Sequence, residues 1–124
     1  MENKKKILIV EDDLLCQMVY KYMFAKDFNS IFCTNEDEFH SALKSDNYDL
    51  VLMDLSLGKG KDGIELIKEL RQMESYKTVP IIAVTANVLK KDEEITMAAG
   101  ATKFVHKPFN NTILLSDCKK FFAD

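Results

Sequence analysis

The chain has 124 residues, a length typical of one domain, and 47% of them are hydrophobic, which is enough for a buried core. Its formal net charge of -3 argues against direct contact with nucleic acid, because a phosphate backbone binds to a basic face. Its apolar runs are far shorter than the roughly 18 to 20 residues of a membrane span. Its three cysteines have no metal-ligand spacing and are typical of small core residues in a reduced protein. We therefore predict one cytoplasmic domain over 1–124, with no membrane segment.

Short apolar runs alternate along the chain with longer segments of helical period, which is typical of a parallel α/β sheet covered on both faces. The predicted strands lie near 6–10, 30–34, 49–53, 80–84 and 103–106. The predicted helices lie near 13–26, 36–46, 63–73, 88–99 and 111–123.

Polar and glycine residues mark several predicted helix ends. Asp13 is the expected N-cap of the first helix. Asn35 and Asp62 each have a glutamate three residues later, which is the capping-box pattern. Gly100 follows two alanines and is expected to end the fourth helix in a left-handed conformation.

Two of the predicted helices have broad apolar faces. The face of the first helix consists of Leu15, Met18, Val19, Tyr22 and Met23. The stripe of the last helix consists of Ile113, Leu114, Leu115, Cys118, Phe121 and Phe122. We expect most of the last stripe to pack on the sheet, and its edge at Leu115 and Phe122 to be available for docking or for a homodimer.

Five polar residues end or follow four of the predicted strands: Glu11, Asp12, Asp54, Thr85 and Lys107. The carboxyl ends of parallel strands meet at the edge of the sheet where ligands bind, so we expect these side chains to converge. Three neighbouring carboxylates would repel one another, and one would take up a proton unless a cation intervened. Mg²⁺ is a hard cation that prefers oxygen ligands, and the sequence therefore predicts a Mg²⁺ site.

Asp54 is the candidate acceptor of a phosphoryl group. A carboxylate can attack phosphorus to form an aspartyl phosphate, and this transfer depends on positioning and charge neutralisation. Mg²⁺ bound by Glu11 and Asp12 would neutralise one side of the phosphoryl group, and Lys107 would neutralise the other. The hydroxyl of Thr85 would donate a hydrogen bond to a phosphoryl oxygen.

The same residues lie in four ordered motifs: ILIVED at 7–12, VLMD at 51–54, VTA at 84–86 and FVHKPF at 104–109. Together these motifs resemble the receiver domain of two-component response regulators, over essentially the whole chain. The resemblance implies a flavodoxin-like (βα)5 three-layer sandwich with a parallel five-stranded sheet of order 2-1-3-4-5. It also implies that Asp54 is the phosphoacceptor.

The resemblance further implies the ligands of the metal. Glu11 and Asp12 are the acidic pair that binds Mg²⁺ together with Asp54. The backbone carbonyl of Ser56 completes the protein ligands.

The resemblance also implies a switch. Thr85 is the switch hydroxyl, Lys107 contacts the phosphoryl group, and the bond from Lys107 to Pro108 is cis. When Thr85 moves toward the phosphoryl group, the ring of Phe104 turns into the vacated space. The surface over 88–123 then changes and binds a downstream protein.

The loop after Asp54 departs from the family pattern. Gly58 stands where a proline is usual, and one extra residue precedes Gly63. Two glycines in this loop make its backbone more permissive. Lys59 and Lys61 are expected to be solvated, although they could attract an anionic phosphodonor.

The favoured interpretation is a phosphoaccepting module that serves a sensor histidine kinase or a histidine phosphotransfer protein. It is not an enzyme beyond self-phosphotransfer and self-dephosphorylation. The alternatives are a receiver excised from a larger hybrid histidine kinase and a degenerate receiver used as a scaffold. A flavin-binding protein is disfavoured by the acidic first loop, which would repel a phosphate. A phosphatase with an aspartyl nucleophile would need an acid where this chain has Ser56.

Overall fold

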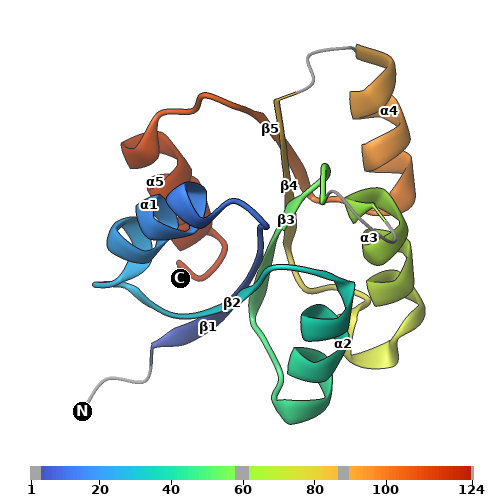
Figure 1. Ribbon diagram of the computed structural model, residues 1–124, viewed down its shortest axis with the longest axis horizontal. Coiled ribbons are helices and arrows are strands. Elements are labelled where there is room, and N and C mark those ends of the chain that lie inside the picture. The colour runs from blue at the N-terminus through green and yellow to red at the C-terminus, as the bar shows by residue number, and fades with distance from the viewer. Residues whose placement is uncertain (1–3, 58–61, 87–89, 124) are drawn as a thin grey trace.

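The computed structural model describes residues 4–57, 62–86 and 90–123. Five parallel strands form one sheet of order β2-β1-β3-β4-β5, which confirms the predicted fold class (Figure 1). The strands are β1 (Lys5–Val10), β2 (Phe28–Cys33), β3 (Leu50–Asp54), β4 (Ile81–Thr85) and β5 (Lys103–His106). The helices are α1 (Leu14–Phe24), α2 (Glu36–Ser45), α3 (Gly63–Gln72), the short 3-10 helix η1 (Glu74–Tyr76), α4 (Lys90–Ala99) and α5 (Asn111–Lys120). In the described part of the chain, no helix is long and apolar enough to cross a bilayer.

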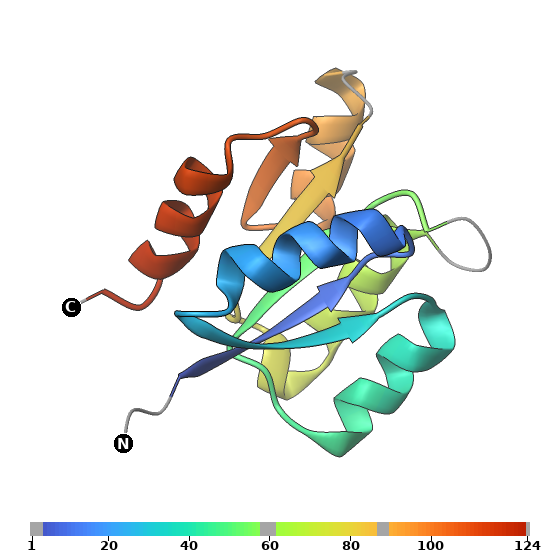
Figure 2. The ribbon, with the colours of Figure 1, turned by 60° about the vertical axis from the view of Figure 1, so that its left-hand side comes forward.

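Helices cover both faces of the sheet, with α2, α3 and α4 on one face and α1 and α5 on the other (Figures 1 and 2). Alternate residues of each strand point to opposite faces, so Leu8 and Val10 pack in the first core while Ile7 and Ile9 pack in the second. Every residue of β3 and β4 is buried. This is why these central strands are continuous apolar runs rather than alternating ones.

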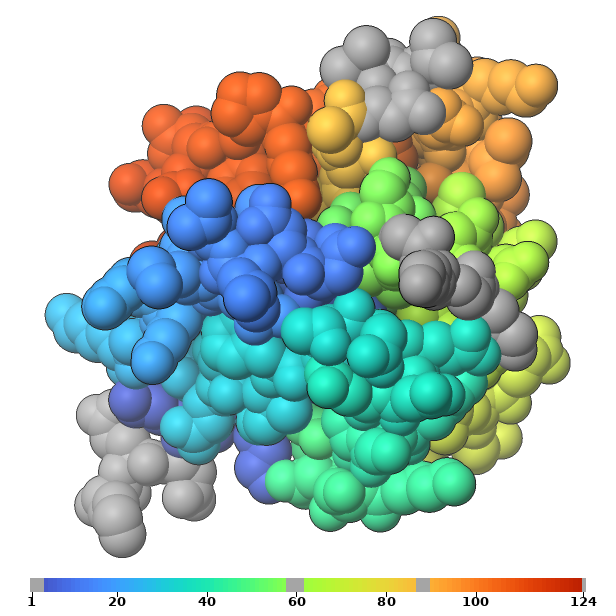
Figure 3. Space-filling model, in the orientation of Figure 1, coloured from blue at the N-terminus to red at the C-terminus, as the bar shows by residue number. Residues whose placement is uncertain are grey.

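Most of the apolar face predicted for α1 points to solvent: Leu15, Met18, Val19 and Tyr22 are exposed, and Met23 alone of this face packs against the second core. Leu15 is 73% exposed and Tyr22 is 75% exposed, whereas Tyr20 and Phe24 are buried in the second core. Tyr20 and Phe24 are four residues apart and form a separate aromatic stripe, which packs on the sheet. The predicted face is thus the wider of the two apolar stripes on α1, whereas the narrower one forms the main contact with the sheet. Figure 3 shows the surface of α1 beside that of α5.

The edge predicted for α5 is also wrong. Leu115 and Phe122 are half-buried and pack against the second core, whereas Ile113 is 60% exposed. Leu114 and Cys118 are the buried residues of this helix, as expected for positions four residues apart.

The predicted helix caps are present. The side chains of Asp13, Asn35 and Asp62 accept hydrogen bonds from backbone N–H groups in the first turns of α1, α2 and α3. Gly100 follows α4 with a φ of 123°, a conformation that favours glycine. The capping box of α2 differs in one detail, because Glu38 accepts its hydrogen bond from the backbone of Thr34, not from that of the N-cap.

Gly63, the first residue of α3, lies against the backbone at the end of β3. A Cβ atom at this position would lie 2.4 Å from the carbonyl oxygen of Asp54 and 2.8 Å from the Cα of Leu55. Only glycine therefore fits here without a shift of the backbone that carries Asp54. The loop features predicted at Gly58, Lys59 and Lys61 lie outside the described residues.

We predict that Gly63→Ala destabilises the protein by about 1–3 kcal/mol, because the added methyl group collides with backbone. Urea unfolding checks this prediction. Ser116→Ala on the exposed side of α5 is the control and should change stability by less than about 0.5 kcal/mol. Equal stability of the two variants would show that the contact at Gly63 relaxes freely.

Candidate functional site

The polar residues predicted to converge come from the carboxyl ends of neighbouring strands. Asp54 ends β3 and is paired with Val84, so it lies beside the end of β4. Glu11 follows β1, and its N–H donates to the carbonyl of Cys33 at the end of β2 (2.9 Å). The N–H of Lys107 donates to the carbonyl of Thr85 (2.8 Å), which fixes the start of the segment after β5. The sheet thus gathers these residues at one edge.

Three carboxylates meet at this edge. Glu11 is 0% exposed and Asp54 is 4% exposed, whereas Asp12 is open to solvent. One carboxylate oxygen of each lies within 4.8 Å of the others. Burial raises the pKa of Glu11, and the neighbouring Asp54 raises it further. Hard oxygen donors crowded in this way fit a divalent cation such as Mg²⁺.

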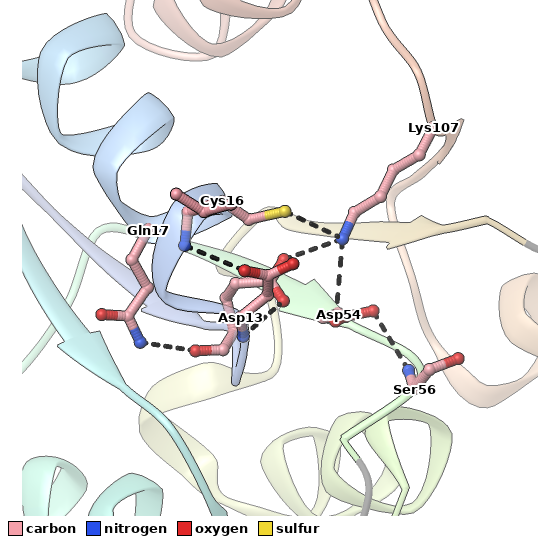
Figure 4. A network of polar contacts seen from close by, with 8 residues as sticks. Asp13, Cys16, Gln17, Asp54, Ser56 and Lys107 are labelled. Atoms are coloured by element: carbon pink, nitrogen blue, oxygen red, sulfur yellow. Dashed lines mark hydrogen bonds and ion pairs between the residues drawn. The ribbon is translucent and has the colours of Figure 1, made fainter.

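Lys107 places its ammonium group beside the buried acids (Figure 4). Its Nζ lies 2.9 Å from Oε1 of Glu11 and 3.8 Å from Oδ2 of Asp54. Burial by itself would lower the pKa of Lys107, but the hydrogen bond with Glu11 and the charge of Asp54 outweigh this effect and raise it. The lysine therefore stays charged and is available to an anion bound at Asp54.

Hydrogen bonds hold the acids in place. Gln17 donates from Nε2 to the backbone carbonyl of Glu11 (2.6 Å), and the N–H of Asp13 donates to the Glu11 carboxylate (3.2 Å). The N–H of Ser56 donates to Oδ1 of Asp54 (3.1 Å), so Ser56 lies next to this carboxylate. The role of the Ser56 carbonyl as a metal ligand stays a prediction.

Sequence reasoning missed the roles of Gln17 and Cys16 at this site. Cys16 packs at the edge of the second core, as a half-buried residue, and its Sγ also lies 3.7 Å from Nζ of Lys107. Burial raises the pKa of this thiol, so it is a neutral neighbour of the lysine. Helical spacing could have revealed both residues. A helix that begins after Asp13 places Cys16 and Gln17 in its first turns, beside the acidic loop.

The predicted switch residues Thr85 and Phe104 lie in the neighbouring strands β4 and β5. Thr85 is 2% exposed at the end of β4. The ring of Phe104 is half-buried, packs against the first core and lies 5.1 Å from the ring of His106 in a perpendicular arrangement. The peptide bond between Lys107 and Pro108 is cis, as expected.

The fold and this edge define a class of protein. It is a flavodoxin-like α/β protein whose ligand edge carries crowded carboxylates and a lysine, and whose loop after β1 is acidic and has no glycine. The chain belongs to the response regulator receiver domain family, whose model matches residues 7–119.

Curated relatives include longer proteins. The chain is 31% identical over 115 residues to the uncharacterized transcriptional regulatory protein YclJ of Bacillus subtilis, which covers 92% of this chain and 49% of the relative. It is 33% identical over 111 residues to the transcriptional regulatory protein CpxR of Klebsiella pneumoniae, which covers 90% of this chain and 46% of the relative. The chain thus spans about half the length of these two relatives.

A solved structure resembles the whole chain. It is the receiver domain of the sensor histidine kinase PA1611 from Pseudomonas aeruginosa, with a TM-score of 0.86 and 29% identity. The match covers 98% of this chain and 100% of that one. A magnesium ion is coordinated in the active-site cleft of that protein.

We predict that Asp12→Asn weakens Mg²⁺ binding about tenfold or more and raises the melting temperature of the metal-free protein. The substitution removes one negative charge from the three carboxylates. This weakens their attraction for the cation and also reduces their mutual repulsion when no cation is bound. Mg²⁺ titration by calorimetry and thermal melts without metal measure the two effects. Asp13→Asn is the matched control, because it removes the same charge at the adjacent position and asparagine is an equally good N-cap. Equal losses of Mg²⁺ affinity in both variants would contradict the assignment.

Proposed function

We propose that this chain is a cytoplasmic phosphoaccepting signalling module in which Asp54 takes a phosphoryl group from a sensor histidine kinase or a histidine phosphotransfer protein. The observation that carries the proposal is the convergence of the Asp54 carboxylate with the acidic pair Glu11 and Asp12 and with the ammonium group of Lys107. Membership of the receiver family supports it.

The transfer needs little beyond this geometry. An oxygen of Asp54 forms a bond to phosphorus while the bond from phosphorus to the donor histidine nitrogen breaks, and that nitrogen keeps the electron pair. Lys107 neutralises a phosphoryl oxygen on its side, and the N–H of Ser56 orients the Asp54 carboxylate. Glu11, Asp12, Asp54 and the Ser56 carbonyl would bind Mg²⁺, which supplies further charge neutralisation.

Phosphorylation is then communicated through Thr85 and Phe104. Thr85 donates its hydroxyl to a phosphoryl oxygen, and the ring of Phe104 moves into the space that is released. Phenylalanine has no hydroxyl, so its two orientations differ in packing alone. The affected surface is the 88–123 segment, which binds the downstream partner.

The exposed face of α1 supports docking of a protein donor beside Asp54. Leu14 and Leu15 are 70% and 73% exposed directly after the acidic loop. A pocket of about 410 Å³ opens between this helix and the segment after β5, with Val19, Lys107 and Phe109 in its lining. A partner that brings a phosphohistidine to Asp54 must dock beside it, and an apolar surface next to the charged site provides a place for that docking.

The alternatives have less support. A degenerate scaffold would not need the complete set of acids together with Lys107. A receiver cut from a hybrid histidine kinase would use the same chemistry at Asp54, so the experiments below apply to it unchanged.

We predict that incubation with acetyl phosphate and Mg²⁺ adds one phosphoryl group to the chain, and that Asp54→Asn abolishes this gain. Intact-mass spectrometry measures it, with EDTA replacing Mg²⁺ as the metal-free arm. Asp37→Asn on exposed α2 is the control and should be phosphorylated like the wild type. Undiminished uptake by Asp54→Asn, with the same acid lability, would refute the acceptor assignment.

We predict that Lys107→Ala keeps the fold but uncouples phosphorylation from the change over 88–123. The variant should lose about 1–3 kcal/mol of stability, because two buried carboxylates lose their cation. Amide NMR shifts of α4, β5 and α5, with and without acetyl phosphate, measure the coupling. Lys103→Ala is the control, since this lysine pairs with Asp117 away from the site. A full wild-type shift pattern in phosphorylated Lys107→Ala would count against the coupling role.

A further inference from the structure

A second group of potential metal ligands lies between α2 and α3, outside the phosphoacceptor site. His40 of α2 places Nε2 2.7 Å from Oε1 of Glu69 of α3. Its other ring nitrogen, Nδ1, lies 4.0 Å from Oε2 of Glu36, one turn earlier in α2. A single imidazole thus faces carboxylates from two different helices, which lie on the same face of the sheet (Figure 1).

The spacing of these three side chains matches a metal site. One ligand atom of each lies within 4.8 Å of the other two. Around a tetrahedral zinc ion with bonds of about 2.0–2.1 Å, ligand atoms are about 3.3 Å apart. A zinc ion takes one ring nitrogen of His40. At Nε2 the 2.7 Å contact with Glu69 would need to open by about 0.6 Å, and Glu36, whose 4.0 Å contact is with Nδ1, would need to turn its carboxylate toward Nε2, which glutamate rotamers allow.

The surroundings favour binding. Glu36 and His40 are four residues apart, so a rigid helix presents them on one face. The ring of His40 packs at 5.4 Å from that of Phe39, which restricts its orientation. The side chains of His40, Glu36 and Glu69 are 37%, 26% and 31% exposed, so the ion has a path from solvent and water can occupy a fourth position.

The donor set selects the kind of ion. Imidazole together with carboxylates suits zinc and other transition metals, whereas Mg²⁺ prefers oxygen ligands and several waters. Glu36 and Glu69 carry like charges, and a divalent cation bound between them would offset the repulsion between their carboxylates.

We propose that Glu36, His40 and Glu69 form a Zn²⁺-binding site that links α2 to α3. The proposal is independent of the function assigned to Asp54. Zinc bound here would join two helices whose N-termini both lie at the ligand edge of the sheet, one of which begins at Gly63 against the backbone of Asp54.

The test is calorimetric titration with ZnCl₂ in excess Mg²⁺, so that the acids around Asp54 are occupied. We expect His40→Gln and Glu69→Gln each to weaken Zn²⁺ binding by at least about tenfold, a loss that removal of even an indirect partner of a metal ligand can cause. His106→Gln, which changes the second of the two histidines, is the matched control and should bind like the wild type. Asp54→Asn should also retain this binding.

A second measurement uses the unaltered chain. Zn²⁺ should shift the side-chain nitrogen resonances of His40 in an NMR spectrum and leave those of His106 in place. Wild-type affinity in His40→Gln, loss of binding in Asp54→Asn instead, or an unshifted His40 ring would overturn the proposal. Wild-type affinity in His40→Gln would show that His40 only links the two helices by hydrogen bonds. Loss of binding in Asp54→Asn would show that zinc binds at the phosphoacceptor site.

Discussion

The balance of charge at the carboxyl edge of the sheet is the constraint on which the rest of the structure depends. Two buried carboxylates, Glu11 and Asp54, face one another, and burial already disfavours the charged form of the first. Among the described residues, Lys107 is the cation that contacts these acids, and the crowded carboxylates can accommodate a further cation. The charge balance of this edge is therefore sensitive to the arrival of further charge.

The backbone is built to keep this edge in register. Parallel pairing between β3 and β4 fixes the height of Asp54 relative to Thr85, and the hydrogen bond from Lys107 to the Thr85 carbonyl ties the next segment to the same level. Gly63, at the start of α3, lies in close contact with the backbone at the end of β3. A displacement of Asp54 therefore requires shifts in α3, β4 and the segment after β5, because these elements are closely packed around it.

Much of this arrangement could be predicted from the sequence, because strand ends in a parallel sheet are placed by topology. The positions of Glu11, Asp54 and Lys107 needed only the order of the strands. Contacts that depend on helix rotation could not be predicted in the same way. Two apolar stripes compete on α1, and only packing selects the one with Tyr20. The hydrogen bond from Gln17 likewise depends on how α1 is rotated against the acidic loop.

The separation of 96 residues between Glu11 and Lys107 has a consequence for biosynthesis. A nascent chain that has left the ribosome only as far as β3 already contains all three carboxylates but lacks their lysine. Their mutual repulsion opposes close approach of the ends of β1 and β3 until the segment after β5, which carries Lys107, emerges or a metal ion binds. A divalent cation bound to these acids would thus stabilise the half-made sheet during translation.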